Sequence, residues 1–278
     1  MRNVKIFADS SANVLQLHST AFAAAPLKVI TNEREFVDDS ALDVEQMVSW
    51  FASYKGKSKT SCPNSSDWLE AFGNADEVYC VTITCGLSGS YNAACAAKQL
   101  YESEHPDKRV CVIDSLSAGP ELVLIIEKLE EYIEQGLSYE EICRNIEAYK
   151  QQTGLVFMLD SLKNFAANGR VSPAVAKIAG VLGIRIVGKA SDQGTLEPTN
   201  KCRGEGKSLS AILSNLIAFG LREGKVRIAH CMNEGAAQEL KGMILAQLPR
   251  VNVQIHMCRG LCCYYAEQGG LLVGFEKL

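Results

Sequence analysis

Histidine is scarce in this chain, with four copies among 278 residues, so few general bases are available for acid–base catalysis. The glycines of a dinucleotide site, G-x-G-x-x-G, do not follow the first expected strand, Val4–Ala8, after which the sequence reads DSSANV. The segment Arg203–Ser208 ends in GKS but has no glycine at the earlier position that a phosphate loop requires. The segment Gly86–Ser90 differs from the G-x-S-x-G elbow of hydrolases because Ser90 takes the place of the second glycine. These absences argue against a dehydrogenase, an NTPase or a serine hydrolase.

Runs of basic residues and long apolar runs are also lacking. The formal net charge is −4, whereas nucleic-acid-binding proteins need a basic face that neutralises phosphates. Asp9 interrupts the N-terminal apolar stretch too early for a secretory signal, and no window approaches the roughly 20 apolar residues of a membrane span. We therefore expect a soluble cytoplasmic protein that binds no nucleic acid and keeps its eleven cysteines as reduced thiols.

The cysteines do not form a recognisable metal site. The densest group of candidate ligands, His256, Cys258, Cys262 and Cys263, lacks the two-pair spacing of a zinc site. Buried free cysteine behaves as a small hydrophobe. We expect neither a metal nor a cofactor.

Short apolar runs alternate with longer segments of helical periodicity. Runs such as VYCVTIT and VCVID are apolar almost throughout, as strands buried on both faces require. Strands are expected at Val4–Ala8, Leu27–Ile30, Glu77–Thr84, Arg109–Asp114, Leu155–Leu159, Ile184–Gly188, Val226–Cys231, Val251–Met257 and Leu271–Phe275. Helices are expected at Ser88–Glu104, Glu121–Gln135, Pro173–Leu182, Gly206–Arg222 and Gly235–Leu248, with another opening at Ser138. The alternation predicts an α/β protein with mostly parallel sheets flanked by helices.

Two helix boundaries carry specific signals. Gly136 is suited to end the helix Glu121–Gln135 in the left-handed conformation, and Ser138 with Glu141 has the spacing of a capping box. A seam near Gln151–Gly154 divides an N-terminal lobe of about residues 1–152 from a C-terminal lobe of about residues 153–278. No flexible linker separates them, so the two lobes are expected to pack tightly.

Three hydroxyl-rich segments stand where strands or loops meet helices: Asp9–Ser11, Lys59–Pro63 and Leu87–Tyr91. Ligands of open α/β sheets collect at the carboxyl ends of strands, and helix N-termini attract anions. Thr60 and Ser88 are therefore candidates to hold a carboxylate without an arginine. For each segment taken alone, helix capping is the favoured explanation, and Asp9 and Ser11 are expected to shape the first turn. Pro63 suits a first helical turn.

Taken in order, these segments resemble the DegV family of lipid-binding proteins, over residues 3–277. The family patterns T-D-S-[ST], K-T-S-x-P-[ST] and S-S-x-L-S-G-T-Y are matched by Ala8–Ser11, Lys59–Asn64 and Thr84–Tyr91. Further matching segments are Pro26–Leu27, Val37–Asp39, Val112–Ser115, Leu159–Leu162 with Asn168–Val171, and Lys201–Gly204.

The resemblance implies a two-lobed DegV-like (EDD) fold with a long-chain fatty acid buried between the lobes. It implies that Thr60 and Ser88 contact the carboxylate, with Ser61 and Gly89 beside them. It also implies a bacterial, non-catalytic subunit that presents the lipid to a separate ATP-dependent fatty acid kinase, which forms an acyl phosphate. Transient contact with a membrane surface fits this role.

Two arginines are candidates for contact with the partner. Arg203 matches the family's K-x-R-G segment, although a solvated loop charge explains it equally well. Arg170 lies in a glycine-containing turn, where structural pairing is the alternative.

The C-terminal segment departs from the family pattern H-x-G-P-G-x-x-G-x-G-F. Tyr265 stands in place of the histidine and Gln268 in place of the proline. A tyrosine hydroxyl still donates a hydrogen bond, but it does not shuttle protons near pH 7 as histidine does. The candidates for the tail pocket are apolar residues, for each of which ordinary core packing is the favoured explanation: Phe157, Phe165, Ile178, Val181 and Leu182.

Two other functions remain open from the residues alone. One is an enzyme that acts on a small anionic substrate in the same cleft, which needs a general base near Ser88. The other is an interaction protein that binds lipid only as a structural plug or a signal.

Overall fold

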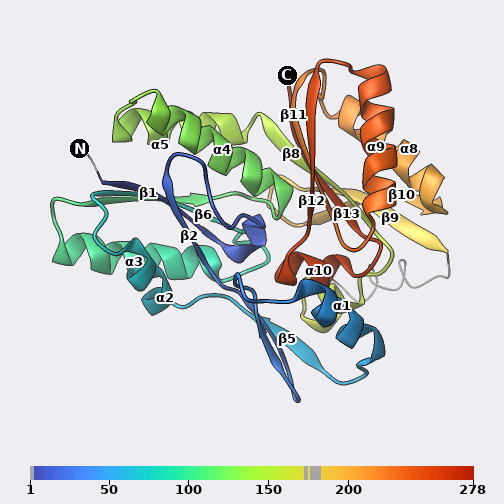
Figure 1. The fold of residues 1–278 in the computed structure, drawn as a ribbon, viewed down its shortest axis with the longest axis horizontal. Helices are drawn as coiled ribbons and strands as arrows, with labels where there is room; N and C mark the ends of the chain where they lie inside the picture. Colours follow the sequence, from blue (N-terminus) through green and yellow to red (C-terminus); the bar gives the residue numbers. More distant parts are fainter. Residues whose placement is uncertain (1–2, 172–174, 176–182) are drawn as a thin grey trace.

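The computed structural model describes residues 3–171, 175 and 183–278, which form three β-sheets with helices between and around them (Figure 1). The first sheet has four strands in the order β2-β1-β6-β7, and all three neighbouring pairs are parallel. Its strands are β1 (Val4–Asp9), β2 (Ala21–Ala25), β6 (Glu77–Thr82) and β7 (Arg109–Asp114). The predicted parallel α/β arrangement is therefore confirmed for this part of the chain.

Helices cover both faces of the four-stranded sheet, which explains why its strands are so apolar. All six residues of β6 are buried: Val78 and Cys80 pack on one face, and Tyr79 and Val81 pack on the other. The first face is covered by α2 (Ser65–Phe72) and α3 (Ser90–Glu104), and the second by α4 (Pro120–Glu134) and α5 (Tyr139–Lys150). Burial on both faces requires the continuous apolar run seen in the sequence.

The second sheet has six strands in the order β10-β9-β8-β13-β11-β12 and is mixed. Its strands are β8 (Thr153–Leu159), β9 (Ile184–Ala190), β10 (Leu196–Arg203), β11 (Gly224–His230), β12 (Val251–Met257) and β13 (Leu271–Glu276). Only β11 and β12 form a parallel pair among its described strands. The prediction of mostly parallel strands does not hold for this sheet, in which the other four pairs are antiparallel. For β9 and β10 the reason is the short turn that joins them, which permits only antiparallel neighbours.

The two faces of the six-stranded sheet bury different clusters. On β8, Val156 and Met158 join the core beneath α8 (Glu205–Ala218) and α9 (Glu234–Gln247). Leu155, Phe157 and Leu159 alternate with them and face the opposite way, since successive strand residues point to opposite faces. This second face packs in one cluster with Val29, Phe36 and the short helix α10 (Gly260–Ala266).

A third, antiparallel sheet has the order β4-β3-β5 and was only partly predicted. It consists of β3 (Lys28–Thr31), β4 (Glu35–Val37) and β5 (Ser58–Ser61), with α1 (Val44–Ser53) between the last two in sequence. In Figure 1 this sheet and α1 lie beside α10, and β3 and α1 both contact α10. Since β4 and β5 are short and β5 is rich in hydroxyls, neither gives a clear apolar signal.

Most predicted boundaries agree with the structure to within a few residues. Gly136 ends α4 with a φ of 74°, and Ser138 and Glu141 form the predicted capping box of α5. The predicted helical position of Pro63 is wrong: α2 begins at Ser65, because Asn64 is the N-cap and accepts hydrogen bonds from two backbone N–H groups of the first turn. The predicted helix at residues 173–182 lies outside the described residues, apart from Val175. No helix in the described part of the chain is both long and apolar enough to span a bilayer.

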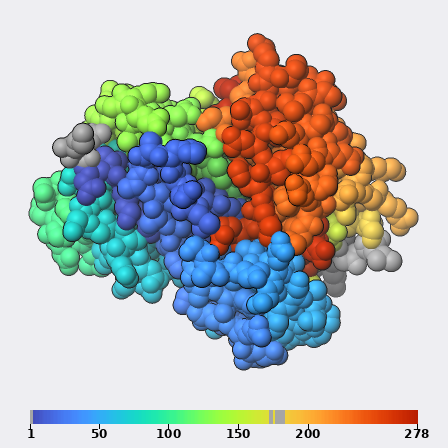
Figure 2. Space-filling view, viewed as in Figure 1, coloured from blue at the N-terminus to red at the C-terminus, as the bar shows by residue number. Residues whose placement is uncertain are grey.

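The predicted boundary near residue 152 falls between α5 and β8. The strands of the four-stranded sheet come from residues 4–114 and those of the six-stranded sheet from residues 153–276. Figure 2 shows the blue-to-green part of the chain packed against the orange and red part over a broad area.

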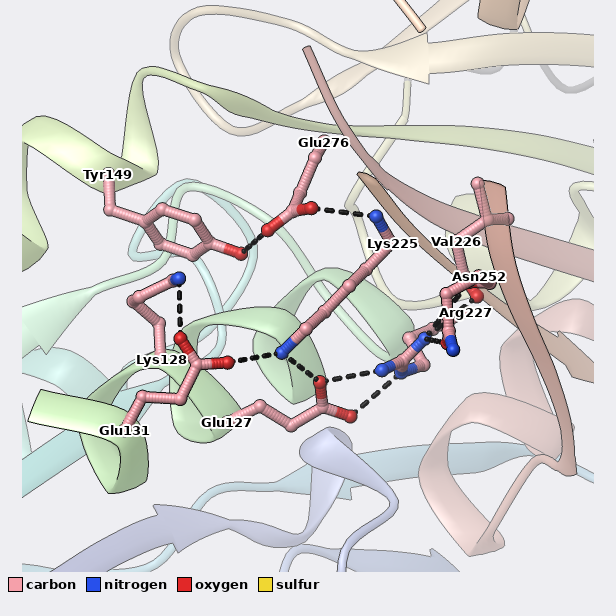
Figure 3. Close-up of polar contacts among 9 residues, drawn as sticks. All are labelled: Glu127, Lys128, Glu131, Tyr149, Lys225, Val226, Arg227, Asn252 and Glu276. Carbon is pink, nitrogen blue, oxygen red and sulfur yellow. Dashed lines mark hydrogen bonds and ion pairs between the residues drawn. The ribbon is translucent and has the colours of Figure 1, made fainter. Parts of the chain in front are cut away.

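An ion-pair network joins α4 to the six-stranded sheet (Figure 3). Glu127 accepts two hydrogen bonds of 2.7 Å from the guanidinium of Arg227, whose exposed fraction is 3%. Lys225 donates to Glu127 at 3.0 Å and to Glu131 at 2.6 Å. Burial alone would raise the pKa of Glu127, but Arg227 and then Lys225 outweigh it and hold the pKa of this carboxyl below its usual range.

The same network continues to the C-terminal strand. Glu276 accepts hydrogen bonds from the Tyr149 hydroxyl and from the backbone N–H of Lys225, both at 2.6 Å. Burial, followed by the contact with Glu276, raises the pKa of the Tyr149 hydroxyl, so it remains a donor at neutral pH. The helices α4 and α5 are thereby attached to β11 and β13.

Protonation of His230 should weaken the fold. His230 is 8% exposed, and its Nδ1 accepts a hydrogen bond from the backbone N–H of Asn233. Burial lowers the pKa of His230 from 6.5, so the unfolded chain binds this proton first on acidification. We expect the free energy of unfolding to decrease as the pH falls from about 6.5 through the lowered pKa of the folded state, and to be unaffected by this group at higher pH.

Urea unfolding between about pH 7.5 and about pH 5.5 measures this decrease. His230→Gln should flatten the pH dependence, because it removes the group that binds a proton more readily in the unfolded chain. An identical slope in the parent and in His230→Gln would contradict the assignment.

Candidate ligand-binding site

A cavity of about 320 Å³ lies between the sheets. This volume is within the range of roughly 300–1,000 Å³ that is usual for small-molecule sites. Its wall is predominantly apolar, with hydroxyl-bearing residues among the remainder. The apolar residues are Leu27, Ile83, Leu87, Ala118, Leu155, Phe157, Leu159, Phe165, Ala190, Leu196, Leu261, Ala266 and Leu272.

The strand pattern determines which apolar residues reach the cavity. Leu155, Phe157 and Leu159 are the alternate residues of β8 that face away from α8 and α9. Leu272 reaches the cavity from β13, whereas its neighbours Leu271 and Val273 are buried in the opposite core. One face of the six-stranded sheet therefore forms much of the apolar wall.

The turn between β9 and β10 covers part of the cavity. Gly194 has a φ of +67° and lines the cavity, and a Cβ at this position would lie 1.9 Å from the Thr84 hydroxyl oxygen. Only glycine fits both the backbone conformation and this close approach. The turn is thus held against the loop that follows β6.

One part of the cavity wall is formed by hydroxyl groups. Thr60 and Ser61 come from the end of β5, and Tyr265 comes from α10. The Thr60 Oγ1 and the Tyr265 hydroxyl are hydrogen-bonded at 2.8 Å. Burial raises the pKa of Tyr265, partly opposed by the Thr60 hydrogen bond and the charge of Arg170. The tyrosine therefore remains a protonated hydroxyl at neutral pH.

A buried carboxylate fixes the helix that carries Tyr265. Asp38, 3% exposed, accepts hydrogen bonds of 2.9 Å from the backbone N–H groups of Gly260 and Leu261 at the start of α10. These N–H groups have no partner inside the helix, so the carboxylate substitutes for a local cap.

The loop that follows β6 supplies Ser88. The Ser88 Oγ accepts a hydrogen bond of 3.2 Å from the N–H of Ser90 in the first turn of α3. The N-cap of α3, Gly89, has no side-chain oxygen to cap the helix, so this terminus presents N–H groups and partial positive charge. Asp9 holds the loop in place by accepting from the Ile83 N–H at 2.8 Å and the Ser90 hydroxyl at 2.7 Å.

The structure brings the predicted head-group residues together. The same cavity is lined by all five of them: Thr60, Ser61, Ser88, Gly89 and Tyr265. A Cβ at Gly89 would lie 3.2 Å from the sulfur of Cys62, which places the end of β5 against the loop before α3.

Only some of the other predicted residues line the cavity. Phe157 and Phe165 line the cavity, whereas Ile178, Val181 and Leu182 lie outside the described residues. Arg203 is exposed at the end of β10 and is not part of the described cavity wall.

Arg170 forms structural pairings, and it also lines the cavity. Its Nε donates to the Leu87 carbonyl at 2.9 Å, and it donates to the Asn168 carbonyl as well. Arg170 thus places a positive charge in the cavity wall near Tyr265.

Several residues of the site were missed from the sequence. Leu155 and Leu159 were detectable, because they share the alternation of Phe157 on an expected strand. Leu196 belongs to a strand that was not expected, and Asn168 had no sequence signal beyond its place in a matched motif. No group of three or more potential metal ligands occurs among the residues that the structure describes, and all eleven cysteines are free.

The fold and the cavity define an α/β binding protein with a largely apolar pocket between its sheets and hydroxyl groups at one place in the wall. The chain belongs to the DegV family, whose family model matches residues 3–277. A DegV domain-containing protein of Streptococcus pneumoniae is 43% identical over 276 residues, which cover 98% of both chains.

Two solved structures are also very similar. A DegV family protein from Eubacterium eligens, loaded with heptadecanoic acid, has a TM-score of 0.96 and 44% identity, covering 99% of this chain and all of that one. The fatty acid kinase B3 protein of S. pneumoniae, loaded with linoleic acid, has a TM-score of 0.97 and 42% identity over the whole of both chains.

Proposed function

We propose that this protein binds a long-chain fatty acid, with the carboxylate at Thr60 and Ser88 and the tail in the apolar part of the cavity. The observation that carries the proposal is the cavity itself: an apolar wall that meets two hydroxyl-bearing segments. Its relatives at 42–44% identity hold fatty acids. In this proposal the tail lies between an N-terminal lobe of about residues 1–152 and a C-terminal lobe of about residues 153–278.

The hydroxyl groups have hydrogens to donate to a carboxylate. In the Thr60–Tyr265 pair one hydroxyl donates to the other, so the pair retains one hydrogen for a ligand. Ser88 acts as an acceptor in its bond with Ser90, which leaves its own hydrogen to donate. Each carboxylate oxygen can therefore receive one donor, and Ser61, Gly89 and the α3 terminus add polarity nearby.

The tail is expected to supply most of the affinity. Burial of a methylene contributes about 0.8 kcal/mol, so some 14 methylenes contribute on the order of 11 kcal/mol before ordering costs. A hydrogen bond to a charged group contributes roughly 1.5–3 kcal/mol, partly offset by desolvation. The tail thus sets the strength of binding, and the hydroxyls set the preference for an acid.

The acid would then be presented to a separate ATP-dependent kinase that forms the acyl phosphate. This part of the proposal is supported by the likeness to the fatty acid kinase B3 protein. In it the chain is a cytoplasmic, non-catalytic subunit without a cofactor of its own. Arg203, which is exposed, and Arg170 are the proposed contacts with the kinase, and loading from a membrane surface would be transient.

Replacing Ser88 with alanine should weaken binding of a long-chain fatty acid by about 10- to 100-fold, because one donor to the charged head group is lost. The affinity for the alcohol of the same chain length should change far less. Isothermal titration of delipidated protein measures both affinities, and circular dichroism should show an intact fold. Ser210→Ala, on the exposed side of α8, is the matched control. Unchanged affinity for the acid in Ser88→Ala would exclude the proposed role of Ser88.

A further inference from the structure

We propose that Asn168 is the positioning residue of the head-group site, which it orders by holding the backbone of Thr60 and the hydroxyl of Tyr264 at once. This inference rests on the proposed function, because it assumes that Thr60 contacts the acid. Asn168 itself is not part of the described cavity wall, so it acts through its neighbours.

The backbone around Asn168 is fixed by a Schellman motif. Asn168 ends the short helix α6 (Lys163–Ala167). The N–H of Gly169 donates to the Ala166 carbonyl at 3.1 Å, and that of Arg170 donates to the Phe165 carbonyl at 2.8 Å. Gly169 has a φ of +70°, which this motif requires and glycine adopts without strain.

The carboxamide of Asn168 joins two elements that carry the site. Its Oδ1 accepts a hydrogen bond of 3.1 Å from the backbone N–H of Thr60. Its Nδ2 donates to the Tyr264 hydroxyl at 3.0 Å and to the Asn164 carbonyl at 2.9 Å. Because β5 is an edge strand of its sheet, this side chain provides the partner that a further strand would otherwise supply to Thr60.

The Tyr264 hydroxyl extends the same arrangement along β5, because it is also hydrogen-bonded to the Ser58 Oγ at 2.7 Å. Ser58 and Thr60 thus meet two consecutive tyrosines of α10, Tyr264 and Tyr265. Asn168 is bonded to one member of each pair: to the backbone N–H of Thr60 in one and to the hydroxyl of Tyr264 in the other. Without it, Thr60 and Tyr265 lose the bracing that aims their remaining hydrogen at the ligand.

Arg170 connects the contacts of Asn168, which we call the brace, to the segment that carries Ser88. Arg170 bonds both the Asn168 carbonyl and the carbonyl of Leu87, the residue before Ser88. The turn Asn168–Arg170 therefore contacts the segments of both proposed carboxylate donors. A residue in this place should control discrimination between head groups and not the affinity for the tail.

The test is the ratio of affinities for a long-chain fatty acid and for the alcohol of the same chain length. Asn168→Ala should lower this acid-over-alcohol ratio about tenfold, while the affinity for the alcohol stays within about twofold of the parent. Asn215→Ala is the matched control, because Asn215 is half-buried and its amide donates to Thr199 and Asn200 away from the cavity. It should leave the ratio unchanged.

A double variant shows whether Asn168 acts through Thr60. The combined loss in Asn168→Ala with Thr60→Val should be clearly smaller than the product of the two single losses, because part of the effect of Asn168 passes through Thr60. Independent, multiplicative losses would overturn the positioning role, and so would an unchanged ratio in Asn168→Ala. If Thr60→Val itself leaves the ratio unchanged, the proposed function fails at the head group.

A second variant keeps the inference testable if Asn168→Ala does not fold. Tyr264→Phe keeps the ring but removes the hydroxyl that Asn168 and Ser58 contact. We expect it to lower the ratio about threefold, with the affinity for the alcohol retained. An unchanged ratio in a folded Tyr264→Phe protein would contradict the brace.

Discussion

Replacing Ala190 with phenylalanine is expected to reduce the affinity for a long-chain fatty acid about 100-fold or more. Ala190 is the last residue of β9, lies opposite Leu196 in the register with β10, and lines the cavity. A phenyl group there displaces about four methylenes of the tail, each worth about 0.8 kcal/mol, a loss on the order of 3 kcal/mol. Titration of delipidated protein with the acid and with the alcohol of equal length measures the effect.

This tail-blocking variant should behave differently from Ser88→Ala. It should weaken binding of the acid and of the alcohol alike, because both place the same chain in the cavity. Ala96→Phe, on the exposed side of α3, adds the same side chain elsewhere and should leave both affinities unchanged. Parental affinity in a folded Ala190→Phe protein would show that the tail lies outside this cavity.

Glu127→Gln should lower the free energy of unfolding by about 3–5 kcal/mol, which corresponds to a Tm decrease on the order of 10 °C. The Arg227 guanidinium is buried and would lose its only carboxylate partner among the described ion pairs. Glutamine accepts one hydrogen bond from it but leaves the charge uncompensated. Urea denaturation and thermal melting measure the loss.

Two comparisons separate this effect from a general loss of surface charge. Glu223 pairs with Arg250 at 3.2 Å, but both side chains are exposed, so Glu223→Gln should cost less than about 1 kcal/mol. Arg227 and Lys225 hold the pKa of Glu127 low in the folded state, so this group contributes stability at higher pH that is lost as the pH falls through its folded pKa. The difference between the parent and Glu127→Gln should therefore shrink below about pH 4.5. Equal stability of the two proteins at pH 7 would contradict the role of the network.

The buried helices and strands could be predicted from the sequence, because a buried element requires apolar residues on each face that it buries. β6 and β7 lie between two layers of helices and are apolar almost throughout, and α5 carries its own capping box. The antiparallel pairs of the six-stranded sheet were not predictable from apolar runs, because periodicity reports burial and not strand direction. β4 and β5 are stabilised by contacts with α10 and α6, distant in sequence, and so give little local signal.

The residues of the candidate site also fall into those with a local sequence signal and those that depend on contacts between distant segments. Thr60 and Ser88 were predicted because hydroxyls beside strand ends and helix starts form a local pattern, and the structure places both in one cavity. The brace at Asn168 depends on contacts between residues about 100 positions apart, which no local pattern encodes. Arg170 was assigned to either a partner or a structural pairing, and its position in the cavity wall became apparent only from the fold.

Native mass spectrometry of freshly purified protein tests the central claim most directly. We expect one molecule of a long-chain fatty acid per chain, with the acid displaced in the Ala190→Phe variant. A protein that carries no such mass and does not acquire one when incubated with a long-chain acid would contradict the account.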